Sequence, residues 1–93
     1  MLTLDSGLRV PPNVTFSVVG QDAFLLNTQT NKYFGLEKVG TRLWELLNEG
    51  KQPREAYQVL LREYKVDASV LEQDVLELLT RMMESGLVEI SGE

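Results

Sequence analysis

The stretch Leu25–Leu47, LLNTQTNKYFGLEKVGTRLWELL, joins two elements that together predict the fold. Its first half predicts a β-hairpin, because two leucines lead into the turn-forming run Asn27–Asn31 and Lys32–Leu36 returns as a short aromatic strand. A helix is expected almost at once, over Lys38–Asn48, where apolar residues recur at helical spacing. A hairpin whose last strand runs directly into a helix sets a sheet edge beside a helical layer.

Upstream of this stretch the pattern is that of a strand. Val14–Val19 alternates with a period of two in a β-rich composition, Gly20–Asp22 predicts a tight turn, and Ala23–Leu26 predicts the next strand. The three strands form an antiparallel meander with the first and third at its edges. Residues 1–13 are expected to be a loose lead-in, because Gly7 and the adjacent prolines at positions 11 and 12 prevent a long regular element.

Downstream the pattern is helical. The first helix ends at Gly50, and Pro53 opens a second helix that runs to about Tyr64. A third helix is expected to start at a capping box formed by Ser69 and the glutamate three residues on, and to end before Gly86. A short extended segment, residues 87–90, closes the chain. These elements predict an α+β fold of winged helix-turn-helix type, a three-stranded antiparallel sheet followed by three helices, in one domain over residues 1–93.

The third helix carries more apolar surface than one core face requires. At roughly 100° per residue its apolar residues span about 160° in two adjacent lines. Such a helix either lies deep in the core or also lines a groove. One line contains Leu71, Val75, Leu78 and Met82, and the other contains Leu76, Leu79 and Met83.

Composition excludes several classes of function. The 93 residues contain no cysteine and no histidine, which removes disulfides, thiolate metal sites and imidazole chemistry. The net charge of −5, with 14 acidic against 9 basic residues, argues against free nucleic-acid binding and favours protein or peptide partners. No signal peptide or membrane-spanning run is found, so a cytoplasmic location is expected.

Catalysis has no candidate residues. The carboxylates Glu72, Asp74 and Glu77 are close in sequence, but the last two face the solvent side of the third helix and read as a solvated acidic face. No glycine-rich phosphate loop is present. We therefore expect no enzymatic activity, no cofactor and no metal.

The strand Lys32–Leu36 is the strongest candidate for a binding site. An ordinary edge strand is one interpretation, and the other is that its free backbone groups accept an extra strand from a peptide. Tyr33 and Phe34 point to opposite faces, which puts large aromatic surface on both sides of a short edge. Trp44 is expected in the core, and Met82 and Met83 favour ordinary packing over a binding groove.

Several short motifs occur in an order that resembles one known family, the PqqD-like RiPP recognition elements, which bind leader peptides of ribosomally made, modified peptides. The resemblance covers about residues 14–90. One departure is Gln52, where relatives often carry a serine or threonine cap. The matching motifs are Leu26-Asn27, Tyr33-Phe34-Gly35-Leu36, Gly40 with Leu43-Trp44, Glu63-Tyr64, Asp74-Val75 and Gly86-Leu87-Val88.

The resemblance implies a winged-helix fold in which a leader peptide adds to the third strand and lies against the third helix. An acidic wall at Asp74 would suit a basic residue on the leader. The helical spacing of the apolar residues leaves open which flank of the third helix faces the peptide. Leu79 and Met83 therefore stay possible as peptide-contacting residues. The implied leader-peptide-binding residues are Lys32, Tyr33, Phe34, Leu71, Asp74, Val75, Leu78 and Met82.

The stand-alone length and the aromatic third strand resemble the leader-binding proteins of lasso-peptide pathways, in which a separate cysteine protease cuts the leader. The other stand-alone member is the peptide chaperone of pyrroloquinoline quinone synthesis, which serves a radical enzyme. Two alternatives come from other classes, a winged-helix DNA-binding regulator and a hydrolase that uses carboxylates alone. An exposed third strand could also pair with its own copy and form a homodimer.

Overall fold

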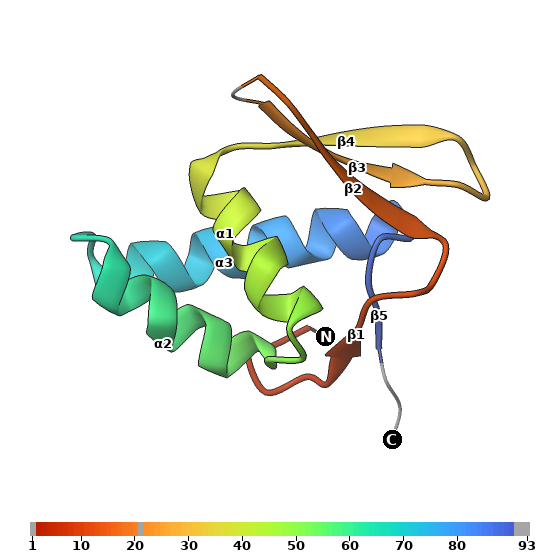
Figure 1. Cartoon of the computed structure of the whole chain (residues 1–93). Coiled ribbons are helices and arrows are strands. Elements are labelled where there is room, and N and C mark those ends of the chain that lie inside the picture. The colour runs from red at the N-terminus through yellow and green to blue at the C-terminus, as the bar shows by residue number, and fades with distance from the viewer. Residues whose placement is uncertain (1, 21, 91–93) are drawn as a thin grey trace.

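The computed structural model describes residues 2–20 and 22–90 and confirms the α+β class. The sheet lies along one side of the helices, and β4 runs directly into α1 (Figure 1). The predicted turn at Gly20–Asp22 includes Gln21, which lies outside the described residues. The elements are β1 (Leu8–Arg9), β2 (Val14–Val19), β3 (Asp22–Asn27), β4 (Lys32–Leu36), α1 (Lys38–Asn48), α2 (Pro53–Glu63), α3 (Ala68–Glu84) and β5 (Glu89–Ile90).

The predicted meander is confirmed, with β3 between β2 and β4 and both pairings antiparallel. Pairs such as Leu25 with Phe34 and Ala23 with Leu36 place the buried side chains of β3 and β4 on one face, toward the helices. Tyr33 points to the opposite face and is 72% exposed. The sheet therefore has one packed face and one open face, as a half-buried antiparallel sheet requires.

The expectation of a loose lead-in over residues 1–13 is wrong for the part that the structure describes. Leu4 and Leu8 are buried in the core, and β1 pairs antiparallel with β5. The side chain of Gln52 accepts a hydrogen bond from the Leu8 amide at 3.0 Å and donates one to the Leu8 carbonyl at 3.4 Å. These contacts join residues more than forty positions apart, which local sequence patterns do not encode.

The start of α3 also differs from the expectation of a capping box at Ser69. Asp67 is the N-cap residue, and its carboxylate accepts hydrogen bonds from the Ser69 and Val70 amides at 2.9 and 3.3 Å. The Ser69 hydroxyl donates to the same oxygen at 2.6 Å. Aspartate caps a helix as well as serine does, and its position two residues earlier lets it reach the free amides of the first turn.

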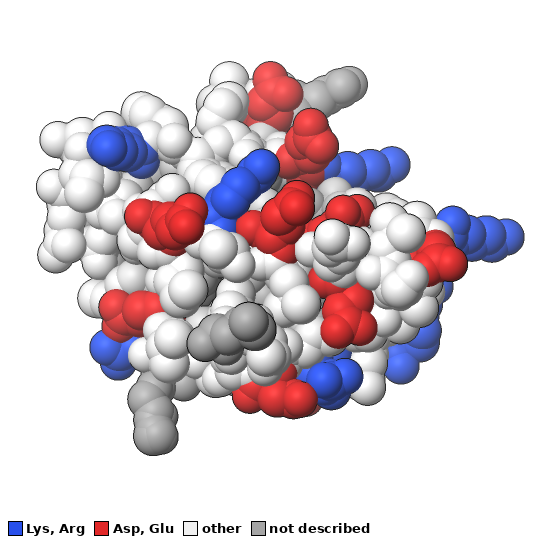
Figure 2. Space-filling model, turned by 180° about the vertical axis from the view of Figure 1, so that it is seen from behind, with Lys and Arg blue, Asp and Glu red and all other residues white. Residues whose placement is uncertain are grey.

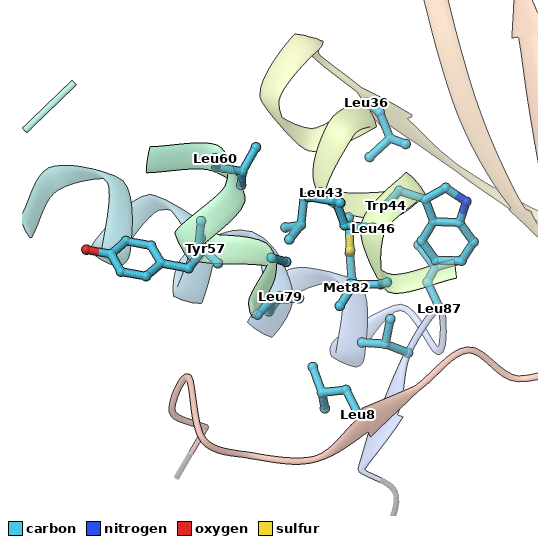
Figure 3. Close-up of a cluster of buried hydrophobic side chains, with 14 of the residues drawn as sticks. Leu8, Leu36, Leu43, Trp44, Leu46, Tyr57, Leu60, Leu79, Met82 and Leu87 are labelled. Carbon is cyan, nitrogen blue, oxygen red and sulfur yellow. The ribbon is translucent and has the colours of Figure 1, made fainter. Parts of the chain in front are cut away.

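The core lies where the three helices meet the sheet and the N-terminal segment (Figure 3). Trp44 is 2% exposed, which confirms its predicted place in the core. Leu79 and Met82 of α3 are fully buried, so the buried stripe of this helix combines residues from both predicted lines. The labelled members are Leu8, Leu36, Leu43, Trp44, Leu46, Tyr57, Leu60, Leu79, Met82 and Leu87.

Asn27 is a buried polar residue that ties the hairpin to the end of α3. Its carbonyl oxygen accepts hydrogen bonds from the Asn13 side chain and the Gln29 amide, both at 2.9 Å. Its amide group donates to the carbonyls of Ser85 at 3.2 Å and Gly86 at 3.4 Å. A side chain that is 4% exposed and bonded on both ends meets the requirement that buried polar groups be satisfied.

Gly86 is required at this junction for two reasons. Its φ of 74° lies in the left-handed region that glycine adopts freely and other residues rarely adopt. A β-carbon added there would lie 2.7 Å from Nδ2 of Asn27, closer than real contacts allow. The glycine that ends α3 therefore also makes room for the asparagine that fastens the hairpin.

Replacing Asn27 with alanine is expected to lower the free energy of unfolding by about 2–3 kcal/mol, because buried carbonyls and an amide lose their partner. Urea denaturation followed by circular dichroism measures this difference. Thr30→Ala, an exposed change in the same hairpin, is the matched control and should stay within about 0.5 kcal/mol of the wild type. Equal, small losses for both variants would show that Asn27 is not the fastening point.

The cap assignment predicts that Asp67→Ala destabilises the fold more than Ser69→Ala does. Hydrogen bonds from the Ser69 hydroxyl and the Val70 and Ser69 amides hold the pKa of Asp67 below its usual value. A lowered folded-state pKa adds stability above the unfolded pKa of about 3.9, and that stability is lost as pH falls through the folded value.

The difference in unfolding free energy between wild type and Asp67→Ala should therefore be full at pH 7 and shrink below about pH 4. Denaturation series at both pH values measure it. A pH-independent difference, or a larger effect from Ser69→Ala, would contradict this assignment.

Candidate functional site

A hollow of about 580 Å³ opens where the end of β4 and the start of α1 face α3. Its walls are mostly apolar. Leu71 and Val75 are buried, and the side chain of Leu78 is half-buried beside them. The residues that line it are Gly35–Gly40, Tyr64, Val66, Val70, Leu71, Asp74, Val75, Glu77, Leu78 and Arg81.

Gly40 brings α1 close to α3 at this hollow. A β-carbon on Gly40 would lie 3.3 Å from Cδ2 of Leu78 and 3.4 Å from Cδ2 of Leu36. Glycine in a helix interior costs stability, and here the missing side chain leaves room for two leucines. The close approach of α1 to α3 at this hollow therefore depends on glycine at position 40.

The open edge of β4 lies next to the hollow. Because β4 ends the sheet, the backbone groups on its outer side have no partner strand among the described residues. Gly35 and Leu36, the last two residues of the strand, also line the hollow. A strand edge beside an apolar cavity can accept an extended chain, with main-chain hydrogen bonds on one side and side-chain contacts on the other.

The strand β4 and the helix α3 run antiparallel to each other along this edge (Figure 1). Lys32 and Glu84 line one shared hollow of about 420 Å³ at one end. In the middle, the guanidinium carbon of Arg81 lies 5.7 Å from the centre of the Phe34 ring, within cation–π range. The helix therefore follows the strand along its whole length.

The structure brings half of the eight predicted site residues into the hollow, namely Leu71, Asp74, Val75 and Leu78. Lys32, Tyr33 and Phe34 lie on β4 itself. Met82 is fully buried in the core and does not line the hollow.

Of the alternative flank, Leu79 is fully buried and Met83 is half-buried. The helical spacing of the sequence could not tell which of these residues face the core and which face the hollow, because distant segments decide what covers each face of the helix.

Residues that the sequence analysis missed complete the hollow. The start of α1 contributes Glu37 to Gly40, and the α2–α3 connection contributes Val66, which is 49% exposed. Val70 at the start of α3 is 53% exposed. The sequence offered one signal, because these two valines belong to neither apolar line of the third helix. The structure leaves both in solvent, where large apolar side chains often mark a binding surface.

Charged groups surround the apolar walls. Three carboxylates, Glu37, Asp74 and Glu77, and two cations, Lys38 and Arg81, line the hollow. None of the ion pairs between described residues involves these five side chains. Figure 2 shows acidic side chains spread across the face behind the view of Figure 1, with most basic side chains toward its margins.

Two further findings bear on the class of site. Within residues 2–20 and 22–90, no three histidine, cysteine, aspartate or glutamate side chains gather as metal ligands would. No helix described by the structure has the length and apolar character needed to cross a bilayer. The described groups thus offer a strand edge, an apolar hollow and unpaired charges.

Comparison with known proteins finds one matching family model and solved structures of similar fold. The family model for coenzyme PQQ synthesis protein D (PqqD) matches residues 22–88. TbiB1, solved in complex with the TbiA(beta) leader peptide, is 34% identical, with a TM-score of 0.82 over 91% of this chain and 99% of that one.

A lasso peptide synthetase B1 complexed with the leader peptide shares the fold, at 24% identity and a TM-score of 0.79 over 90% of this chain and 99% of that one. No curated protein sequence matches the chain. Because the family model spans most of the sequence, the chain belongs to the PqqD family.

Proposed function

We propose that this protein binds the leader peptide of a ribosomally synthesised, post-translationally modified precursor, of the lasso-peptide type. The leader adds as a strand to the open edge of β4 and sets side chains into the hollow beside α3. The bound leader is then presented, in the cytoplasm, to a separate leader peptidase of the cysteine-protease type. Such a role needs a binding surface and no catalytic group on this chain.

One observation carries the proposal: the likeness to TbiB1, a protein solved with a leader peptide, over nearly the whole of both chains. The local geometry supports the same role. The β4 edge is open, Tyr33 and Phe34 flank it on opposite faces, and the apolar hollow adjoins its end.

A second candidate follows from the matching family model, which is that of a coenzyme PQQ synthesis protein. In this alternative the chain carries a precursor peptide to a radical enzyme. Both candidates use the same edge and the same hollow. Isothermal titration with each class of precursor, a lasso-type leader and a PQQ-type precursor peptide, separates them by which one binds.

Strand addition predicts that proline on β4 weakens leader binding by about tenfold or more, because proline removes a backbone donor. Amides of neighbouring strand residues point to opposite edges, so one of Tyr33→Pro and Phe34→Pro removes an outward-pointing amide and spares the pairing with β3. Titration calorimetry with the leader peptide encoded beside this chain measures the loss in the variant that folds.

The opposite edge of the sheet supplies the matched control. Ser17→Pro and Val18→Pro make the same pair of changes on β2, and the one that folds should bind the leader as the wild type does. Unchanged affinity in a folded β4 variant would refute strand addition. An equal loss from both edges would point to general damage to the sheet.

The position of the hollow predicts that two residues one turn apart on α3 affect different properties, one leader binding and the other stability. Leu78→Ala is expected to weaken leader binding several-fold with a modest loss of stability, because its half-buried side chain lines the hollow. Met82→Ala is expected to lower the unfolding free energy by about 2–5 kcal/mol, because it empties a core position.

Met82→Leu keeps the volume and should restore most of that stability. Paired denaturation and titration experiments check both variants. Weaker binding from a fully folded Met82→Leu variant, with no effect from Leu78→Ala, would place the peptide on the other flank of α3.

A further inference from the structure

The charges along α3 change sign within the length of a short bound strand. Arg81 lies over the Phe34 ring near the middle of β4, and Glu77 and Asp74 follow toward the hollow. At a rise of about 1.5 Å per residue, Glu77 lies roughly 6 Å and Asp74 roughly 10 Å from Arg81 along the helix axis. The open side of the site is therefore basic at one point and acidic one to two helical turns away.

In a bound strand, the side chains that could span the distance between Arg81 and the carboxylates are two residues apart. Its side chains alternate between the helix-facing and the outer face, so helix-facing neighbours lie about 6.6 Å apart. The separation between Arg81 and the two carboxylates thus corresponds to a spacing of two or four residues of the peptide. Charged side chains at that spacing on the helix-facing side meet Arg81 and the carboxylates together.

The sheet suggests the direction of the peptide. Strands β2, β3 and β4 are all antiparallel, and antiparallel pairing is slightly the more stable arrangement. A peptide antiparallel to β4, which runs from Lys32 to Leu36, places its N-terminal part beside Leu36 and the acidic end of α3. Its C-terminal part then passes Arg81.

We propose that the leader selected by this chain carries a basic side chain followed two or four residues later by an acidic one, both facing α3. This rests on the proposed function and adds the charge pattern of the peptide. The basic residue lies against Asp74 and Glu77, and the acidic residue lies against Arg81.

The groups that would read this pattern are available to a ligand. Asp74, Glu77 and Arg81 are exposed, and none forms an ion pair with another described side chain. Glu37 and Lys38, adjacent at the start of α1, also line the hollow and offset each other in charge. The net preference therefore comes from the α3 residues, and each exposed pair contributes a factor of about 1.4 to 5 in affinity.

The test is a charge swap, with the synthetic leader peptide encoded beside this chain as the probe. In the wild type, reversing the charge of the basic and the acidic leader residue together should weaken binding by about 2- to 25-fold. The triple variant Asp74→Lys, Glu77→Lys, Arg81→Glu should lose affinity for the native leader and regain it for the reversed leader. Both effects should shrink as sodium chloride rises to about 0.5 M.

Glu72→Lys is the matched control, because it changes an exposed carboxylate of the same helix that does not line the hollow. The charge pattern is refuted if the wild type binds the leader but the leader lacks such a pair, or if the triple variant prefers the native leader as the wild type does. If the folded wild type does not bind the leader at all, the proposed function itself fails. Rescue of the reversed leader by the triple variant, and not by Glu72→Lys, would establish the pattern.

Discussion

The buried side chain of Asn27 fastens the hairpin to the end of α3, and the geometry of the site depends on it. Its amide group bonds the carbonyls of Ser85 and Gly86, where the helix ends, while its oxygen holds the segment before β2 through Asn13. In a core, an amide left without these partners would be costly, so these hydrogen bonds favour this placement of the hairpin. That placement lays β4 along α3.

The other end of the site is set by a missing side chain. Gly40 lets the first turn of α1 approach Leu36 and Leu78, so strand, first helix and third helix converge there. The hydrogen bonds of Asn27 at one end and the close contact of Gly40 at the other fix the position of β4 along α3. The open edge of β4 therefore lies beside apolar walls and charged side chains.

Two edges of the same sheet have different surroundings. β2 carries exposed apolar residues such as Val18 and Val19, but the charged and apolar wall of α3 lies beside β4. Open edges invite unwanted pairing, and proteins usually block them. The edge of β4 that is left open beside the hollow is the edge to which the proposed leader peptide would add. The same openness would permit pairing between two copies when no peptide is present.

Local patterns in the sequence determined most of the elements. The turn run Asn27–Asn31, the alternation in β2 and the glycines after α1 and α3 set the three-stranded sheet and the helices to within a residue or two, because hydrogen bonds and backbone freedom there are short-range. The strand β1 was not predicted, because it pairs with the distant β5. Only the tertiary structure decided which side chains are buried. It placed Met82 in the core and Leu78 at the hollow, and it packed Leu4 and Leu8 under the helices, because burial depends on which distant segment covers each face.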